Sequence, residues 1–303
     1  MFGQITGRTN VSTATNPFGA PRRMRNIIGT DENHFLIYAD WKSQEAVIQA
    51  ALSGDPGIKK GLESGDIYLY TAKAAGAVPA DGKRKQYEKQ REQYKQTFLA
   101  TGYGQTAYGL KEKLNISEAE AAHLLSKLKI LYPTYFDWID GIIKAACARG
   151  YFETKFGWRY YPSDKETTNP RRLMNWPLQS HGSEILRRAM IDLDESGFEI
   201  SMPIHDAVLI HCKRKNLRAM INDIKKVKSI MSGAAFKVIG WNIPVDTKLI
   251  ADQFYQDAEH QERWDKLYEK LLKAKSGRIT DTTCNENGQT VTKTTHPSIQ
   301  VSI

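Results

Sequence analysis

The sequence predicts an α+β fold, because short apolar strands near both ends of the chain enclose a long helical region. Residues 34–41 (HFLIYADW) and 199–212 (EISMPIHDAVLIHC) have the length and composition of buried strands. Between them, residues 67–150 show helical spacing of apolar side chains. With 303 residues, of which 41% are hydrophobic, the chain is long enough for one large domain or two smaller ones.

The other elements follow in order along the chain. Residues 43–55 (SQEAVIQAALSGD) have the pattern of a helix, and Ser117 with Glu120 forms a capping box that opens another. The helical region is interrupted at GAVPADGK (76–83). The remaining expected elements are a hairpin at 151–162, a helix of about 20 residues after Pro177, an amphipathic helix at 216–231 and a strand within 238–250.

The composition favours a polyanionic partner and gives no sign of export. Forty-three Lys and Arg against 34 Asp and Glu leave a net charge of +9. The start of the chain lacks the pattern of a secretory signal, and no run approaches the roughly 18 apolar residues of a membrane span. The three cysteines, widely spaced and odd in number, are read as reduced thiols in a cytoplasm.

Two aspartates, Asp40 and Asp206, each follow an apolar strand and are separated by 166 residues. On neighbouring strands of one sheet they would hold two Mg²⁺ ions, which activate an attacking hydroxyl and neutralise a leaving phosphate. Taken singly, each aspartate is more readily explained as an ordinary turn or strand-end acid. Only the other features favour the metal site.

A second feature is the helix around residues 91–104 (REQYKQTFLATGYG), where Arg91, Lys95, Leu99 and Tyr103 recur at intervals of four. Such a face suits a nucleoside triphosphate, with cations for the phosphates and an apolar, aromatic end for sugar and base. The alternative is a solvated basic face. Neither a Walker phosphate loop nor a G-x-G-x-x-G motif is present, so side chains and metals would have to hold the nucleotide.

Three segments in order resemble motifs A, B and C of the family A DNA polymerases, the group of bacterial DNA polymerase I and many phage replicases. They are residues 39–55, 91–110 and 204–210, and the connecting segments 148–162 and 175–190 are similar as well. The resemblance covers roughly residues 5–255. Several matching segments in order are far more specific than one motif.

The resemblance implies a role for individual residues. Asp40 and Asp206 would bind two Mg²⁺ ions, with Mn²⁺ as a possible substitute, and the Trp41 carbonyl would be a further ligand. Lys95 would protonate the departing pyrophosphate, and Glu45 would exclude the ribose 2′-hydroxyl. The nucleotide-binding set is Gln44, Glu45, Tyr68, Arg91, Lys95, Leu99 and Tyr103, and the DNA-binding set is Arg8 (in Thr6-Gly7-Arg8), Arg171, Asn175, Gln179 and His205.

The resemblance also implies a polymerase right hand, with an antiparallel palm sheet backed by helices and an inserted helical fingers subdomain. We expect the palm at 1–62 and 186–275, the fingers at 63–185 and a flexible polar tail at 276–303. Fewer than 40 residues precede Asp40, so we expect no thumb and no 3′–5′ exonuclease domain. A separate thumb or processivity subunit is therefore a candidate partner, beside DNA primer-template and deoxynucleotides.

Three positions depart from the family pattern. Ala207 stands where motif C usually has an acid, Leu99 where an aromatic ring packs against the sugar, and Tyr68 where a histidine is frequent. Ala207 puts in doubt an auxiliary role for a third carboxylate at the metal site, and Leu99 puts in doubt the usual discrimination at the 3′ position of the sugar.

The expected function is template-directed DNA synthesis without proofreading, in the cytoplasm of a bacterial or phage-infected host cell. One alternative is a non-catalytic DNA-binding subunit or a split polymerase that needs a partner. Another is a single-subunit RNA polymerase, which Glu45 disfavours because a bulky acid near the 2′ position penalises ribonucleotides.

Overall fold

The computed structural model describes residues 4–8, 25, 27–167, 169–251, 258–276, 280–284 and 290–294. These residues form two compact units, which we describe separately. The larger unit holds the described residues within 1–11 and 31–251, and the smaller unit those within 12–30 and 252–303. None of the described helices combines the length and the apolar character needed to cross a bilayer.

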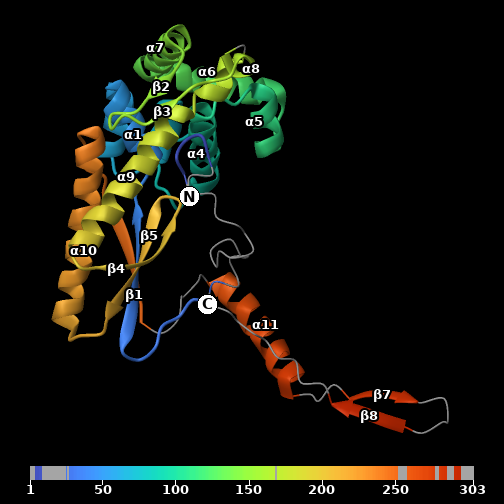
Figure 1. Ribbon diagram of the computed structural model, residues 1–303. Coiled ribbons are helices and arrows are strands. Elements are labelled where there is room, and N and C mark those ends of the chain that lie inside the picture. The colour runs from blue at the N-terminus through green and yellow to red at the C-terminus, as the bar shows by residue number, and fades with distance from the viewer. Residues whose placement is uncertain are drawn as a thin grey trace. The chain divides into compact units, whose positions relative to one another are not determined.

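The larger unit is built on a four-stranded antiparallel sheet in the order β4-β5-β1-β6 (Figure 1). Its strands are β1 (His34–Trp41), β4 (Glu199–Ile204), β5 (Ala207–Lys213) and β6 (Val245–Ile250). In the central strand, Asp40 is paired with Ala207 of β5 on one side and with Asp246 of β6 on the other. The α+β class and the antiparallel sheet agree with the prediction.

Helices α9 (Trp176–Glu195) and α10 (Leu217–Ile239) run side by side along one face of the sheet (Figure 1). Alternate residues of β1 face them, and α1 (Gln44–Ser53) completes this first core. The Trp41 indole N–H donates to the Met231 carbonyl at 3.0 Å, so this large ring is buried with its polar atom satisfied. The buried β1 and α10 residues include Phe35, Ile37, Ala39, Trp41, Val227, Met231 and Ala234.

A second core lies among the helices that follow α1. Their bounds are α2 (Pro56–Glu63), α3 (Ile67–Ala74), α4 (Glu88–Gly102), α5 (Ala107–Leu114), α6 (Glu118–Leu131) and α7 (Pro133–Arg149). The rings of Tyr68, Phe98 and Tyr132 meet edge to face, with centroid distances of 5.9 and 5.6 Å. The predicted capping box at Ser117 and Glu120 is present at the start of α6. The shorter elements are β2 (Phe152–Glu153), β3 (Arg159–Tyr160), α8 (Asp164–Thr167) and the 3₁₀-helix η3 (Pro170–Leu173).

One fully buried carboxylate, Asp55, joins the starts of two helices of this region. Its Oδ1 accepts from the N–H groups of Gly57 at 2.8 Å and Ile58 at 3.0 Å, in the first turn of α2. Its Oδ2 accepts from the Tyr135 N–H at 3.0 Å, in the first turn of α7. Helix N-termini leave these donors unpaired and carry partial positive charge, so a single anion stabilises both ends.

We expect Asp55→Ala to destabilise the protein by about 2–4 kcal/mol, because it leaves three N–H groups without an acceptor, those of Ile58 and Tyr135 in buried positions. Urea unfolding followed by circular dichroism measures the change. The control is Asp81→Ala, which removes an exposed aspartate from the loop between α3 and α4. Equal stability of the two variants would contradict a capping role for Asp55.

Several elements differ from the sequence predictions. Helix α2 was not expected, and α10 extends eight residues beyond the predicted end at 231. In the smaller unit, α11 (Ala258–Ser276) was missed because ion pairs support it, Arg263 with Glu259 at 2.6 Å and Lys266 with Glu262 at 2.7 Å.

The predicted polar tail contains a hairpin of β7 (Thr280–Cys284) and β8 (Thr290–Thr294). Its threonine-rich strands explain this difference, because β-branched residues favour extended backbone even without a hydrophobic pattern. The other residues predicted as tail beyond 276 lie outside the described ones. The division into palm and fingers stays a prediction, since the two cores belong to one compact unit, while 258–275 belong to the smaller unit.

Candidate active site

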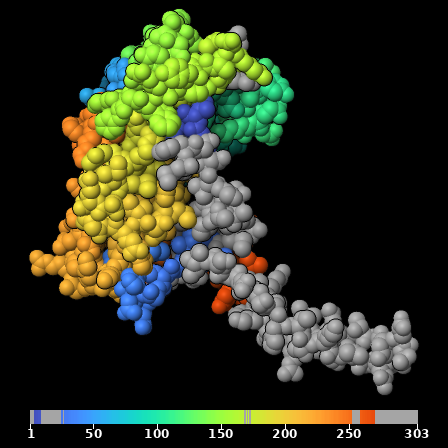
Figure 2. Space-filling view, in the orientation of Figure 1, coloured from blue at the N-terminus to red at the C-terminus, as the bar shows by residue number. Residues whose placement is uncertain are grey.

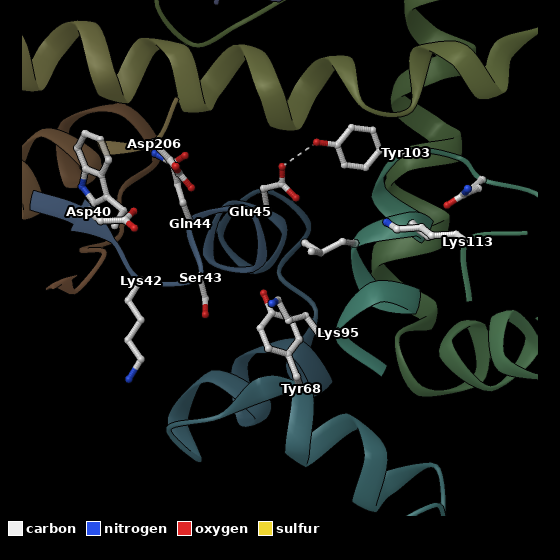
Figure 3. A pocket seen from close by; sticks show the side chains of 14 residues that line it. Asp40, Lys42, Ser43, Gln44, Glu45, Tyr68, Lys95, Tyr103, Lys113 and Asp206 are labelled. Atoms are coloured by element: carbon white, nitrogen blue, oxygen red, sulfur yellow. Dashed lines mark hydrogen bonds between the residues drawn. The ribbon is translucent and has the colours of Figure 1, made fainter. Parts of the chain in front are cut away.

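A cavity of about 950 Å³ opens where β1 passes into α1 (Figure 3). Its walls come from β1, α1, α3, α4, α5 and the turn between β4 and β5. The residues that line it are Asp40, Trp41, Lys42, Ser43, Gln44, Glu45, Tyr68, Lys95, Leu99, Ala100, Tyr103, Gln105, Lys113 and Asp206.

The sheet brings the two predicted aspartates together at one end of this cavity. Asp40 is the penultimate residue of β1, and Asp206 lies in the β4–β5 turn, where its carbonyl accepts from the Trp41 N–H at 3.3 Å. The turn is tight, because His205 has a φ of 50°, in the left-handed region that few non-glycine residues adopt. Figure 3 shows both carboxylates at the same end of the pocket.

The environment of Asp40 is unfavourable for a lone carboxylate. Burial, together with the charges of Asp206 and Asp246, raises its pKa to about 7, although Lys248 acts in the opposite direction. Asp40 Oδ1 is buried and has no hydrogen-bond partner among the described residues. A cation placed here would remove both penalties.

Asp246 is a charged neighbour of this site that sequence reasoning missed. It is paired with Asp40 across β1 and β6, so the two side chains leave the same face of the sheet. On the other side of Asp40 stands Ala207, where the family pattern has an acid. The signal in the sequence was weak, because Asp246 is simply a polar residue within the strand predicted at 238–250.

Helix α4 presents only part of its predicted face to the cavity. Lys95, Leu99 and Tyr103 line it, whereas Arg91 does not. Arg91 is 9% exposed, donates from Nε to Asp66 Oδ2 at 2.7 Å, and lies with its guanidinium 5.4 Å from the Tyr68 ring centre. In this arrangement Arg91 is not positioned to bind a triphosphate in the cavity, because Asp66 at the start of α3 holds its guanidinium.

The Arg91 contact fixes the charge of Asp66. Burial would raise the pKa of this carboxyl, but the Arg91 hydrogen bond and the Leu69 N–H outweigh it, so the pKa is lowered. The second predicted cation, Lys95, is also paired, with Glu92 Oε2 at 3.3 Å. Asp66 lies before α3 and Glu92 lies within α4 itself. The predicted face of α4 took neither acid into account.

Glu45, the predicted sugar filter, is held by a small network from three elements. Gln179 Nε2 of α9 donates to Glu45 Oε1 at 2.6 Å and to the Tyr103 hydroxyl at 3.0 Å. Tyr103, at the end of α4, donates to the same Glu45 oxygen at 3.1 Å (Figure 3). Burial and the Glu45 charge raise the pKa of Tyr103 to about 12, so it remains a donor. Gln44 also lines the cavity but is 3% exposed and packs against Gly182 of α9.

The predicted Thr6-Gly7-Arg8 segment is bound by side chains of α9. Ser183 Oγ donates to the Thr6 carbonyl at 2.8 Å, and Arg187 Nη1 to the Gly7 carbonyl at 2.9 Å. Gly7 has a φ of 72°, a left-handed conformation that favours glycine, and a Cβ there would lie 2.8 Å from Arg187 Nη1. In Figure 2 this segment (dark blue) is seated between α9 and the residues around the β2–β3 hairpin.

The five residues predicted to touch DNA lie outside the cavity lining. Gln179 is 3% exposed and supports Glu45, so its expected DNA contact is not apparent here. Arg171, in η3, lines a neighbouring cavity of about 610 Å³, which shares Gln105 with the first. Arg8, Asn175 and His205 lie near α9 or in the β4–β5 turn.

Five lining residues were not predicted from the sequence. Lys42 and Ser43 follow β1 directly, and Ala100 lies between two predicted residues of α4. Gln105 lies in the loop that precedes α5, and Lys113 lies in the last turn of α5. In the sequence, only their closeness to motifs A and B could have indicated that these residues line the cavity.

The sheet with two aspartates at one end, and the inserted helices that face them, define a nucleic acid polymerase fold of the palm-and-fingers class. The sequence profile of DNA polymerase family A matches residues 9–256. The chain therefore belongs to DNA polymerase family A, as the motif resemblance predicted.

Curated relatives match this chain at low sequence identity. The chain is 24% identical over 263 residues to DNA polymerase I of Rhizobium leguminosarum, covering 82% of this chain and 24% of the relative. It is 27% identical over 248 residues to DNA polymerase I of Mycobacterium bovis, covering 73% and 27%. The chain thus spans about a quarter of the length of these curated relatives.

A solved structure has the same fold. The POL domain of Pol1 from M. smegmatis, in complex with DNA primer-template and dNTP, superposes with a TM-score of 0.70 at 24% sequence identity. The match covers 82% of this chain and 46% of that one.

Proposed function

We propose that the chain is a template-directed DNA polymerase, which adds deoxynucleotides to a primer 3′-hydroxyl by two-metal phosphoryl transfer. One observation carries the proposal: a single cavity collects Asp40, Asp206, Lys95 and Glu45 from four separate elements. Phosphoryl transfer depends on positioning and charge neutralisation more than on covalent chemistry, and this set supplies both.

In the proposed reaction, the primer 3′ oxygen attacks the α-phosphorus, a new P–O bond forms, and the bond to the β-phosphate breaks as pyrophosphate leaves. Lys95 would approach the phosphates and give a proton to the departing pyrophosphate. Tyr103, at the far end of α4, would stand near the templating base. Glu45, fixed by Gln179 and Tyr103, would occupy the space of a ribose 2′-hydroxyl.

The residues at the aspartate end fit Mg²⁺. The donors are hard carboxylate oxygens, and the buried Asp40 Oδ1 has no protein partner within the described residues. No three His, Cys, Asp or Glu side chains converge on one metal position in the described part of the chain. Mg²⁺ takes one or two carboxylates and completes its shell with water and substrate phosphates.

Asp40 and Asp206, with the Trp41 carbonyl, would hold the ions. When bound, they would polarise the attacking hydroxyl and offset the charge of the leaving group.

The proposed partners are a DNA primer-template and deoxynucleotides. The solved relative from M. smegmatis is itself in complex with DNA primer-template and dNTP. A net charge of +9 supports binding to a polyanion. A separate thumb or processivity subunit, the lack of proofreading and a cytoplasmic location stay predictions.

Primer extension tests the proposal. With Mg²⁺ and a primed DNA template, we expect the wild type to add deoxynucleotides in template order and Asp206→Asn to lose at least about a thousandfold in rate. The matched control is Asp194→Asn, which changes an exposed aspartate at the C-terminal end of α9 and should extend primers normally. Both substitutions remove one negative charge, so net charge cannot explain a difference.

Duplex binding, measured in parallel by fluorescence anisotropy, separates chemistry from binding. Retained binding by Asp206→Asn would assign its loss to the chemical step. Extension by Asp206→Asn at the wild-type rate would refute the proposed mechanism. Binding without extension by the wild type would favour a split or non-catalytic subunit.

A further inference from the structure

Lys42 occupies a distinctive place in the cavity. It follows Trp41 at the end of β1, and its N–H donates to the Pro244 carbonyl at 2.8 Å, which fixes its backbone to the chain entering β6. Its exposed side chain lies beside Ser43 and extends away from the Asp40 carboxylate (Figure 3). The ammonium group is thus displaced from the proposed metal ligands (Figure 3).

The backbone next to Lys42 also favours an anion. Ser43 has φ 52° and ψ 40°, and its side chain makes no capping hydrogen bond to α1. The first N–H groups of α1 therefore have no partner from the side chain that precedes the helix, and Ser43, Gln44 and Glu45 line the cavity. A helix N-terminus attracts phosphate, and here Lys42 directly precedes Ser43, the N-cap residue of α1.

The other cations of the region are less available. Arg91 is paired with Asp66 and Lys95 with Glu92. Lys42 forms no ion pair with any residue that the structure describes. Lys113, the remaining lysine of the lining, lies at the opposite end of the cavity from Asp40 (Figure 3).

We propose that Lys42 binds the β- and γ-phosphates of the incoming nucleotide, and the pyrophosphate formed from them, together with the N-terminus of α1. This inference rests on the proposed polymerase function. Nucleotide addition occurs at the α-phosphorus beside Asp40 and Asp206, so the leaving phosphates extend away from these carboxylates, where the Lys42 side chain lies. Lys42 thereby supplies a cation that needs no release from a protein acid.

The test compares Lys42→Met with the wild type in steady-state primer extension. We expect the KM for deoxynucleotide to rise about tenfold, because a charge-assisted hydrogen bond to phosphate is lost. Inhibition by added inorganic pyrophosphate should weaken by a similar factor, whereas the KM for primer-template should change less than about twofold. Lys42→Arg should restore most of the affinity, since it keeps the positive charge.

The matched control is Lys60→Met, which removes an exposed lysine from α2 outside the cavity and should behave as wild type. An unchanged KM and unchanged pyrophosphate inhibition in Lys42→Met, with wild type and Lys60→Met active, would overturn the inference alone.

If the wild type does not extend primers, the polymerase proposal fails separately. Titration calorimetry with inorganic pyrophosphate and Mg²⁺ then still decides the role of Lys42. Binding that weakens about tenfold in Lys42→Met supports the phosphate site, and equal binding by both proteins refutes it.

Discussion

Asp40→Asn is expected to abolish primer extension and, in the same protein, to raise stability at pH 8 in the absence of divalent cations. The pKa of Asp40 is raised from 3.8 to about 7 by burial and by the neighbouring Asp206 and Asp246 charges. Between pH 4 and 7 the folded protein therefore keeps a proton that the unfolded chain releases, so stability falls as the pH rises through this window. The amide carries no such charge.

The gain at pH 8 should be about 1–2 kcal/mol, after allowance for the water that screens a partly exposed carboxyl. Below pH 4 the Asp40 carboxyl of the wild type is protonated and, like the amide of the variant, carries no charge. The two proteins should then unfold at similar temperatures. Thermal unfolding at pH 8 and pH 4, with chelator present, measures both values. Asp194→Asn again serves as control, and an equal difference at the two pH values would contradict electrostatic repulsion at Asp40.

Adding Mg²⁺ should reverse the order. The ionised Asp40 and Asp206 pair gains stability from the cation, whereas Asp40→Asn retains only one of the two carboxylates and gains less. A site that carries a stability penalty when empty of cations is typical of residues kept for function rather than for folding.

Glu45→Ala should raise the incorporation of ribonucleotides relative to deoxynucleotides by about 10- to 100-fold, since it opens the space that a 2′-hydroxyl would need. Single-nucleotide extension with each substrate gives the ratio of the two kcat/KM values. Glu63→Ala, an exposed acid at the end of α2, controls for the loss of charge. An unchanged ratio in Glu45→Ala would remove Glu45 from sugar selection.

In the same assay, Tyr103→Phe separates the position of the Glu45 carboxylate from its presence. This change removes one of the two hydrogen bonds to Glu45 Oε1 and leaves the one from Gln179 at 2.6 Å. We expect an intermediate ratio, because the acid remains but is less firmly oriented. A ratio equal to that of Glu45→Ala would indicate that orientation, and not bulk, makes the discrimination.

Sequence reasoning located the elements whose local signals are strong. The strand at 34–41, the two strands around His205 and Asp206, and the capped start of α6 all have local causes, namely apolar runs, turn residues and a capping box. The structure also brings Asp40 and Asp206 into one cavity, as the strand-end pattern suggested. The roles assigned to these residues remain predictions.

What the sequence could not indicate depends on contacts between distant segments. Arg91 has the right spacing on α4, yet its partner Asp66 lies 25 residues earlier, so its burial was not visible in the pattern. Gln179 was expected at the DNA and instead supports Glu45, 134 residues away. The position of Asp246 beside Asp40 depends on the register of β6 against β1. A shift of one residue would turn its side chain to the other face of the sheet.

The binding of residues 5–8 to α9 can be followed by the intrinsic fluorescence of two tryptophans. The Ile5 carbonyl accepts from the indole N–H of Trp176 at 3.1 Å and from that of Trp158 at 3.5 Å. Indole emission responds to the polarity and hydrogen bonding of its surroundings. Release of these few residues would remove both hydrogen bonds and shift the emission wavelength of the two tryptophans. Tryptophan fluorescence would therefore report in solution, without any added dye, whether the segment is bound.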